Sequence, residues 1–118
     1  MQTVIETAEF LKEAARYGLD GEDRAELVTF LASEPAAGQP IPGTGGYRKL
    51  RLAGRGKGKS GGYRVITFFT GPNIPVFLIT IYSKGEQDDL SQAQKRTMMQ
   101  MSKTLVASYE RKRTVRRR

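Results

Sequence analysis

The stretch that decides the fold runs from residue 47 to residue 82 and contains three β-strand patterns. It reads YRKLRL at 47–52, YRVITFF at 63–69 and VFLITIY at 76–82. Basic and apolar side chains alternate in the first, as in a strand with one face on a core. The third is apolar throughout most of its length, which predicts a central strand covered on both faces. Connections of hairpin length favour antiparallel pairing.

Helical patterns precede the strands. The first helix begins at Thr7 or Glu9, and Gly18 ends it as a left-handed cap. Asp20 is predicted to cap a second helix. Pro35 ends that helix, because the residue before a proline avoids the helical region. Two short helices joined in this way form a helical hairpin.

A further helix is predicted after the strands, where Ser91 and Gln94 have the spacing of a capping box. The last ten residues, YERKRTVRRR, hold six Lys and Arg, and we expect like charges to fray this end. The predicted architecture is an α+β domain at 1–110 followed by a basic tail at 111–118. In it, the N-terminal helical hairpin packs on a twisted antiparallel sheet of three to four strands, with a C-terminal helix. A short strand at 3–5 supplies the fourth.

Composition narrows the classes of function. The 118 residues suit one domain, and no apolar run is long enough to span a membrane, so we expect no membrane partner. The first ten residues contain two Glu and no basic residue, unlike a signal peptide. Cysteine is absent, which fits a reducing cytoplasm. Histidine is absent too, so a catalyst here must use Lys, Arg, Tyr, Asp, Glu, Ser or Thr.

The net charge of +8 is unevenly distributed along the chain. Residues 1–34 hold eight acidic and three basic side chains, whereas residues 35–85 hold eight basic and no acidic ones. Scattered charge would keep the chain in solution equally well. A long stretch without a carboxylate therefore indicates a surface for a polyanion such as RNA.

Three groups of cations are candidates for that surface. Lys49 and Arg51 share one face of the first strand. Arg64 begins the second strand and Lys84 follows the third, so these two could converge on one phosphate. The loop between the first two strands carries three more cations, Arg55, Lys57 and Lys59. For each group the alternative is an ordinary solvated surface.

The motif GTGGYRKLR…GKGKSGGYRVI…ITIYSKGEQDDLS resembles the sheet of the RelE/ParE toxin superfamily, in its HigB-like branch, and the resemblance covers roughly residues 3–106. It implies the toxin of a type II toxin–antitoxin pair. RelE-like members enter the ribosomal A site and cut mRNA with basic residues, without a metal or cofactor. The implied partners are mRNA, the ribosome with its rRNA, and a cognate antitoxin, expected to be a small helix-turn-helix DNA-binding protein.

The resemblance also assigns roles to residues. Lys49 and Arg51 take the basic active-site positions, and Arg64 matches the arginine that contacts the scissile phosphate. Lys84 stands near a further catalytic arginine, with Gly85 as the other alignment. The RNA-binding residues are expected to be Arg48, Arg55, Lys57, Lys59, Tyr47 and Tyr63.

The chain departs from some relatives in one respect, because Leu90 and Ser91 occupy the place of a tyrosine. Another residue must then stack on the RNA base. Tyr47, Tyr63 and Tyr82 are the candidates, with core packing as the alternative role for at least two of them.

The implied reaction is attack by a ribose 2′-OH on the adjacent phosphorus. Cations stabilise the charge that develops, and a lysine crowded by other cations can accept the proton, a role that fits Lys49 beside Arg51. Two other functions stay open. One is a gyrase-poisoning toxin of the ParE kind, which the concentrated basic strand disfavours, and the other is a non-catalytic RNA- or DNA-binding module.

Overall fold

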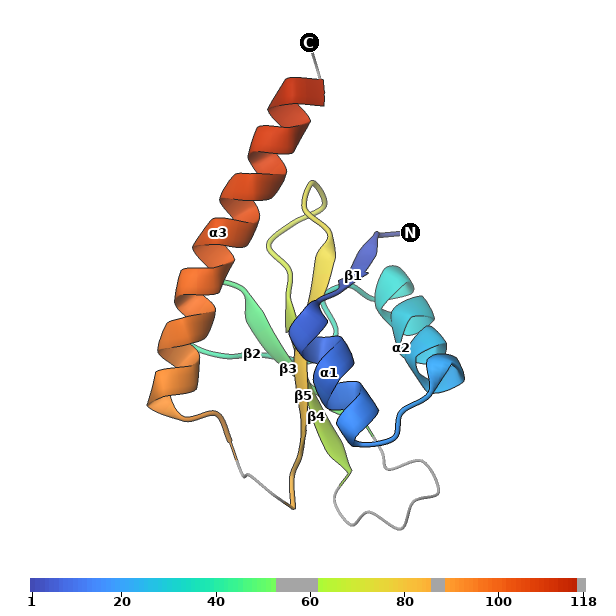
Figure 1. The fold of residues 1–118 in the computed structure, drawn as a ribbon. Coiled ribbons are helices and arrows are strands. Elements are labelled where there is room, and N and C mark those ends of the chain that lie inside the picture. Colours follow the sequence, from blue (N-terminus) through green and yellow to red (C-terminus); the bar gives the residue numbers. More distant parts are fainter. Residues whose placement is uncertain (53–61, 86–88, 117–118) are drawn as a thin grey trace.

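The computed structural model describes residues 1–52, 62–85 and 89–116. A five-stranded sheet separates two short helices from one long helix (Figure 1). The strands lie in the order β1 (Val4–Glu6), β5 (Val76–Ser83), β4 (Tyr63–Phe68), β3 (Tyr47–Leu52) and β2 (Gln39–Pro40). The helices are α1 (Ala8–Arg16), α2 (Gly21–Ser33) and α3 (Gln92–Arg116).

The α+β prediction is confirmed, but the sheet is mixed rather than antiparallel. Strands β3, β4 and β5 pair antiparallel as expected, and β2 adds two residues at the β3 edge. Strand β1 instead runs parallel to β5, with Val4 opposite Val76. The prediction paired only neighbours in sequence, whereas β1 and β5 are joined through the whole of the intervening chain. As a result β4 is the middle strand, and β5 lies between β1 and β4.

The predicted helix ends are confirmed by hydrogen bonds. The Thr7 hydroxyl accepts the backbone N–H of the first turn of α1, and Gly18 follows that helix with φ +79°. Asp20 opens α2 with a reciprocal capping box. Ser91 and Gln94 exchange the same pair of bonds, at 2.8 and 3.1 Å, where α3 begins.

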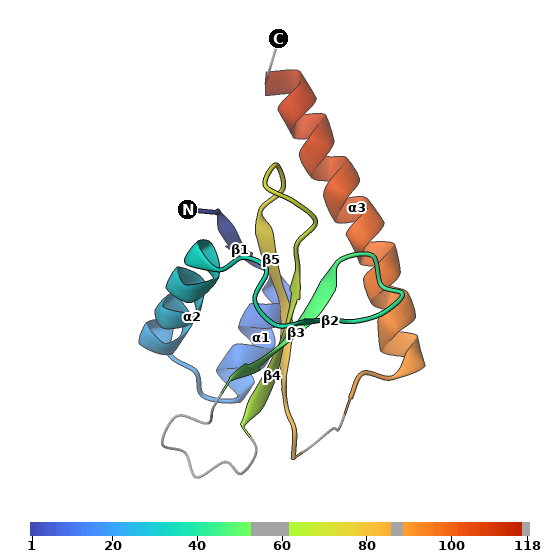
Figure 2. The same ribbon diagram turned by 180° about the vertical axis from the view of Figure 1, so that it is seen from behind.

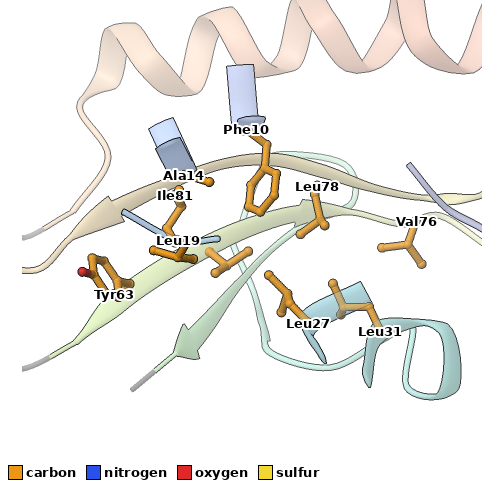
Figure 3. Close-up of a cluster of buried hydrophobic side chains, with 10 residues drawn as sticks. Phe10, Ala14, Leu19, Leu27, Leu31, Tyr63, Val76, Leu78 and Ile81 are labelled. Atoms are coloured by element: carbon orange, nitrogen blue, oxygen red, sulfur yellow. The ribbon is translucent and has the colours of Figure 1, made fainter. Parts of the chain in front are cut away.

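Two hydrophobic cores lie on opposite faces of the sheet. In the first, Phe10 and Ala14 from α1 and Leu27 and Leu31 from α2 point toward the sheet (Figure 3). The strands contribute Tyr63, Val65, Val76, Leu78 and Ile81 to this core. The second core lies on the α3 side and contains Tyr47, Ile66, Phe68, Ile74, Phe77, Ile79, Tyr82, Leu90 and Met98.

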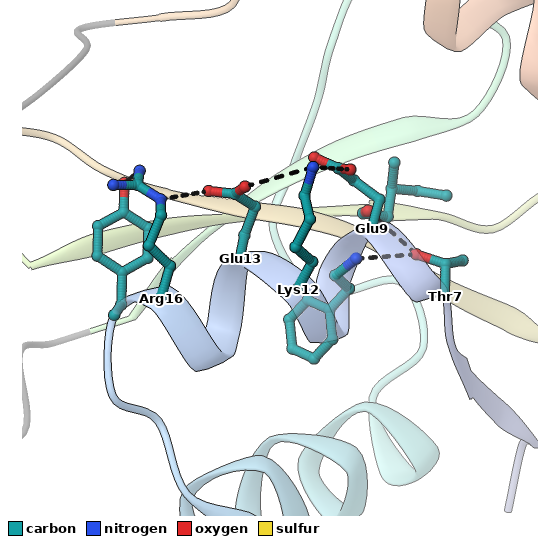
Figure 4. A network of polar contacts seen from close by, with 8 residues as sticks. Thr7, Glu9, Lys12, Glu13 and Arg16 are labelled. Carbon is teal, nitrogen blue, oxygen red and sulfur yellow. Dashed lines mark hydrogen bonds and ion pairs between the residues drawn. The ribbon is translucent and has the colours of Figure 1, made fainter.

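Helix α1 lies along β5 beyond the point where β1 ends. The Thr7 hydroxyl donates to the Leu78 carbonyl at 2.7 Å, and the Ser83 N–H donates to the Tyr17 hydroxyl at 3.0 Å. The charged side chains of α1 pair mainly with one another (Figure 4): Glu13 is 2.9 Å from Arg16 and 4.0 Å from Lys12. The cations of this helix are therefore largely neutralised locally.

Helix α3 is anchored to the sheet near its start. Tyr47 is fully buried, and its hydroxyl donates a hydrogen bond to the Met98 carbonyl. Burial raises the pKa of Tyr47 to about 12, so this phenol stays neutral. The helix continues to Arg116, past residue 110, where the sequence analysis placed the start of a basic tail. Lys and Arg are good helix formers, and cations are favourable near a helix C-terminus.

Candidate nucleic-acid interface

Strand β3 divides its side chains between the two faces of the sheet. Leu50 and Leu52 pack against the first core, whereas Tyr47 belongs to the second. Because side chains alternate along a strand, Lys49 and Arg51 lie on the same side as Tyr47, the side of α3. Their backbones are separated by about 7 Å along the strand. The predicted alternation is therefore present.

The strand register brings Arg64 to these two cations. Arg51 pairs directly with Arg64, and Arg64 pairs directly with Tyr82 on β5. Opposed residues in an antiparallel ladder have Cβ atoms about 4.5–5.5 Å apart and point to the same face. Lys49 lies in the next row, opposite Ile66. We call Lys49, Arg51 and Arg64 the cationic face.

The sequence interpretation missed Asp89. Its Oδ1 lies 3.3 Å from the Lys49 Nζ and also accepts the Leu90 N–H at 2.8 Å. The Leu90 N–H lowers the pKa of Asp89 most, burial opposes it, and Lys49 lowers it further. The available signal was the acidic sequence GEQDD at 85–89, which comes soon after the last strand pattern.

Tyr82 packs in the second core, as expected for at least two of the three tyrosines, but it also lies beside the cationic face. It is 5% exposed, and among the described residues its hydroxyl has no hydrogen-bond partner. Burial raises the pKa of Tyr82, the Asp89 carboxylate raises it further, and Arg64 lowers it. A neutral phenol thus completes the row formed by Arg51 and Arg64. The position of Tyr82 beside Arg64 depends on the pairing register of three strands, and no local sequence pattern specifies that register.

Lys84 lies in the turn after β5, outside the register that joins the other three cations. It is exposed, and its backbone N–H donates to the Gly62 carbonyl at 3.3 Å. It therefore stands at the end of the sheet where the row of Arg51 and Arg64 lies.

Tyr47, Tyr63 and Arg48, the residues expected to bind RNA that the structure describes, do not share one surface. Tyr47 and Tyr63 are 0% and 1% exposed and pack in opposite cores, so neither ring is available to a base in this structure. This corrects their assignment, and the reason is their position in strands packed on both faces. Arg48 points to the opposite side from Lys49 and donates to the Gly38 carbonyl at 3.5 Å. The loop cations Arg55, Lys57 and Lys59 lie outside the described residues.

The cationic face is open rather than enclosed. A cavity of about 660 Å³ lies between the 43–45 turn and α3, and one of about 360 Å³ lies between β5, α1 and α3. Neither is lined by Lys49, Arg51 or Arg64. Within the described residues, no three carboxylates gather as metal ligands, and no helix there is long and apolar enough to cross a membrane. An open row of cations suits an extended polyanion better than a small molecule.

These features define a small α+β domain with one helical hairpin, one long helix and a cationic strand on the sheet between them. The family model described as "RelE toxin of RelE / RelB toxin-antitoxin system" matches residues 6–115. The chain therefore belongs to the RelE toxin family. A solved structure of an arginine double mutant of the E. coli toxin RelE in the free state has a similar fold, with a TM-score of 0.52 and 18% sequence identity. The alignment covers 74% of this chain and 87% of that one.

Proposed function

We propose that this chain is a ribosome-dependent endoribonuclease of the HigB-like branch, which cuts mRNA in the A site and inhibits translation in the cytoplasm. One observation carries the proposal: Arg51 and Arg64 are directly opposed in the ladder, with Lys49 in the next row. Like charges in opposed positions are destabilising. Their placement on one open face is favourable once a phosphate lies between them.

The residues on this face suit metal-independent cleavage. The ribose 2′-oxygen attacks the adjacent phosphorus, the bond to the 5′-oxygen breaks, and the departing 5′-oxygen takes a proton from water, so the products are a 2′,3′-cyclic phosphate and a free 5′-OH. Arg51 and Arg64 stabilise the additional negative charge on the phosphorane. Lys49 accepts the 2′-OH proton once RNA has replaced its contact with Asp89. Lys84 contributes charge at the end of the row.

The decisive variant is Arg64→Ala, assayed by in vitro translation with primer-extension mapping of the mRNA ends. Loss of one preorganised donor to the transition state costs on the order of 2.7–4 kcal/mol, so cleavage should fall about 10²–10³-fold. Lys12→Ala is the matched control, because it removes a cation that is 68% exposed on α1. Circular dichroism checks that both variants fold. Unchanged cleavage by folded Arg64→Ala would place the site elsewhere.

The same assay separates the other two functions. A gyrase poison would leave the mRNA intact and inhibit supercoiling by purified gyrase. A non-catalytic binding module would slow translation without producing new 5′ ends. The concentrated cations of β3 and β4 favour the nuclease.

We further propose a cognate antitoxin, a small helix-turn-helix protein with an acidic segment that folds over the cationic face. The acidic N-terminal third of the chain would repel such a segment from the helical hairpin. Affinity should then fall steeply as the salt concentration rises. Affinity that is indifferent to salt would favour binding through apolar contacts on another surface.

A further inference from the structure

Asp89 is held in a defined place beside the cationic face. Its neighbour Leu90 is 7% exposed and packs in the second core. The next residue, Ser91, forms the capping box that starts α3. The Asp89 backbone is therefore fixed on its C-terminal side, and its carboxylate meets Lys49 at 3.3 Å. The two side chains are 57% and 31% exposed, so solvent and other anions reach the pair.

We propose that Asp89 occupies, on Lys49, the position of an RNA phosphate, and that RNA must displace it before cleavage begins. The inference rests on the proposed function and adds the regulation of the same site. Carboxylate and phosphate oxygens are equivalent acceptors for an ammonium group. A phosphate that approaches Lys49 therefore competes with the carboxylate for the same donors and is repelled by its charge.

The burial of Tyr82 supports such a displacement. Its hydroxyl lies in the row of Arg64 and has no hydrogen-bond partner among the described residues. Leu90 packs in the same core as Tyr82, and the chain links it directly to Asp89. When the Asp89 side chain turns away from Lys49, with its backbone kept in place by Leu90 and Ser91, RNA bound to the cationic face lies in the row of this hydroxyl. A buried hydroxyl without a partner is unfavourable, so a hydrogen bond from Tyr82 to the RNA would favour the displaced state.

The expected effect follows from Coulomb's law. Two unit charges about 3–4 Å apart in a solvated site interact strongly enough to change affinity about five- to tenfold. Asp89→Asn keeps the shape and removes the charge, so it should tighten RNA binding by about this factor at low salt. The gain should shrink as the salt concentration rises.

The test compares wild type, Asp89→Asn and the control Glu22→Gln, which removes an exposed carboxylate from α2 on the other side of the sheet. Binding is measured by fluorescence anisotropy with a 2′-O-methyl single-stranded RNA, and with ribosomes carrying a 2′-O-methyl A-site codon. Only Asp89→Asn should bind more tightly, and the gain should shrink in a Lys49→Ala background to what charge repulsion alone supplies. Equal affinity for wild type and Asp89→Asn on both probes overturns the inference, and so does a gain that is just as large without Lys49.

Cleavage of unmodified mRNA on programmed ribosomes separates this inference from the proposed function. If no variant cleaves but Asp89→Asn binds more tightly through Lys49, the nuclease proposal fails and the competition stands. If wild type cleaves and Asp89→Asn loses cleavage at unchanged affinity, Asp89 is a catalytic group, and the competition is overturned.

Discussion

Two tyrosines in the second core should respond in opposite directions when their hydroxyls are removed. Tyr47→Phe deletes the hydroxyl that donates to the Met98 carbonyl and lies within hydrogen-bond reach of Ser102, both in α3. The Met98 carbonyl lies inside α3 and still accepts its hydrogen bond within the helix, so the substitution leaves no acceptor without a partner. The free energy of unfolding should therefore fall by about 1 kcal/mol, the net value of one buried hydrogen bond.

Tyr82→Phe is the matched change, because the Tyr82 hydroxyl is buried without a partner among the described residues. Its removal relieves a desolvation cost and should leave the protein equally stable or more stable. The free energy of unfolding of both variants is measured by urea unfolding followed by circular dichroism. The dependence of this free energy on urea concentration should be the same in both variants and wild type. Amide hydrogen exchange should speed up about fivefold around Met98 in Tyr47→Phe alone. A clear loss of stability in Tyr82→Phe, or none in Tyr47→Phe, would refute this account of how α3 is held.

Three further predictions concern the site and its support. Gly38→Ala would place a Cβ 2.8 Å from the Lys49 carbonyl oxygen at φ +93°, so thermal unfolding should show a loss of about 1–3 kcal/mol. The Leu90 N–H and, to a smaller extent, Lys49 lower the pKa of Asp89 in the folded protein, so these contacts stabilise it above the unfolded pKa and are lost as pH falls through the folded value. When the free energy of unfolding is measured as pH falls below about 4, it should therefore decrease slightly less in Asp89→Asn than in wild type. The difference should be less than about 1 kcal/mol because the pair is exposed. Replacing Arg55, Lys57 and Lys59 together with Ala should weaken ribosome binding and flatten its salt dependence, with little change in the rate at saturation.

Local patterns in the sequence predicted the elements of the fold well. Helix ends followed from side chains that bond their own backbone, as at Asp20 and Ser91, and such signals are contained within four residues. The parallel pairing of β1 with β5 could not be predicted in this way. It joins Val4 to Val76, and nothing in either segment specifies the other.

In the candidate site, too, local features could be predicted from the sequence and contacts between distant segments could not. Alternation within β3 placed Lys49 and Arg51 on one face, because the period of a strand is fixed by its backbone. The pairing of Arg51 with Arg64 depends on the register of two strands that a loop connects. Their place in one site was suggested by the family resemblance and not by a local sequence pattern. The contact between Lys49 and Asp89 spans 40 positions and was missed.

Strand β3 links the stability of the protein to its proposed activity. One face of this strand carries Tyr47, which anchors α3, and four residues further along carries Arg51 beside Arg64. The long helix therefore covers the apolar end of this face, and the cations lie toward the other end. Asp89 stands where α3 begins, so the position of the helix also fixes the carboxylate that meets Lys49. On the proposed mechanism, a partner that shifts the start of α3 would move Asp89 relative to Lys49 without touching the cationic face, and a partner that binds these cations would compete with Asp89 as RNA is proposed to do.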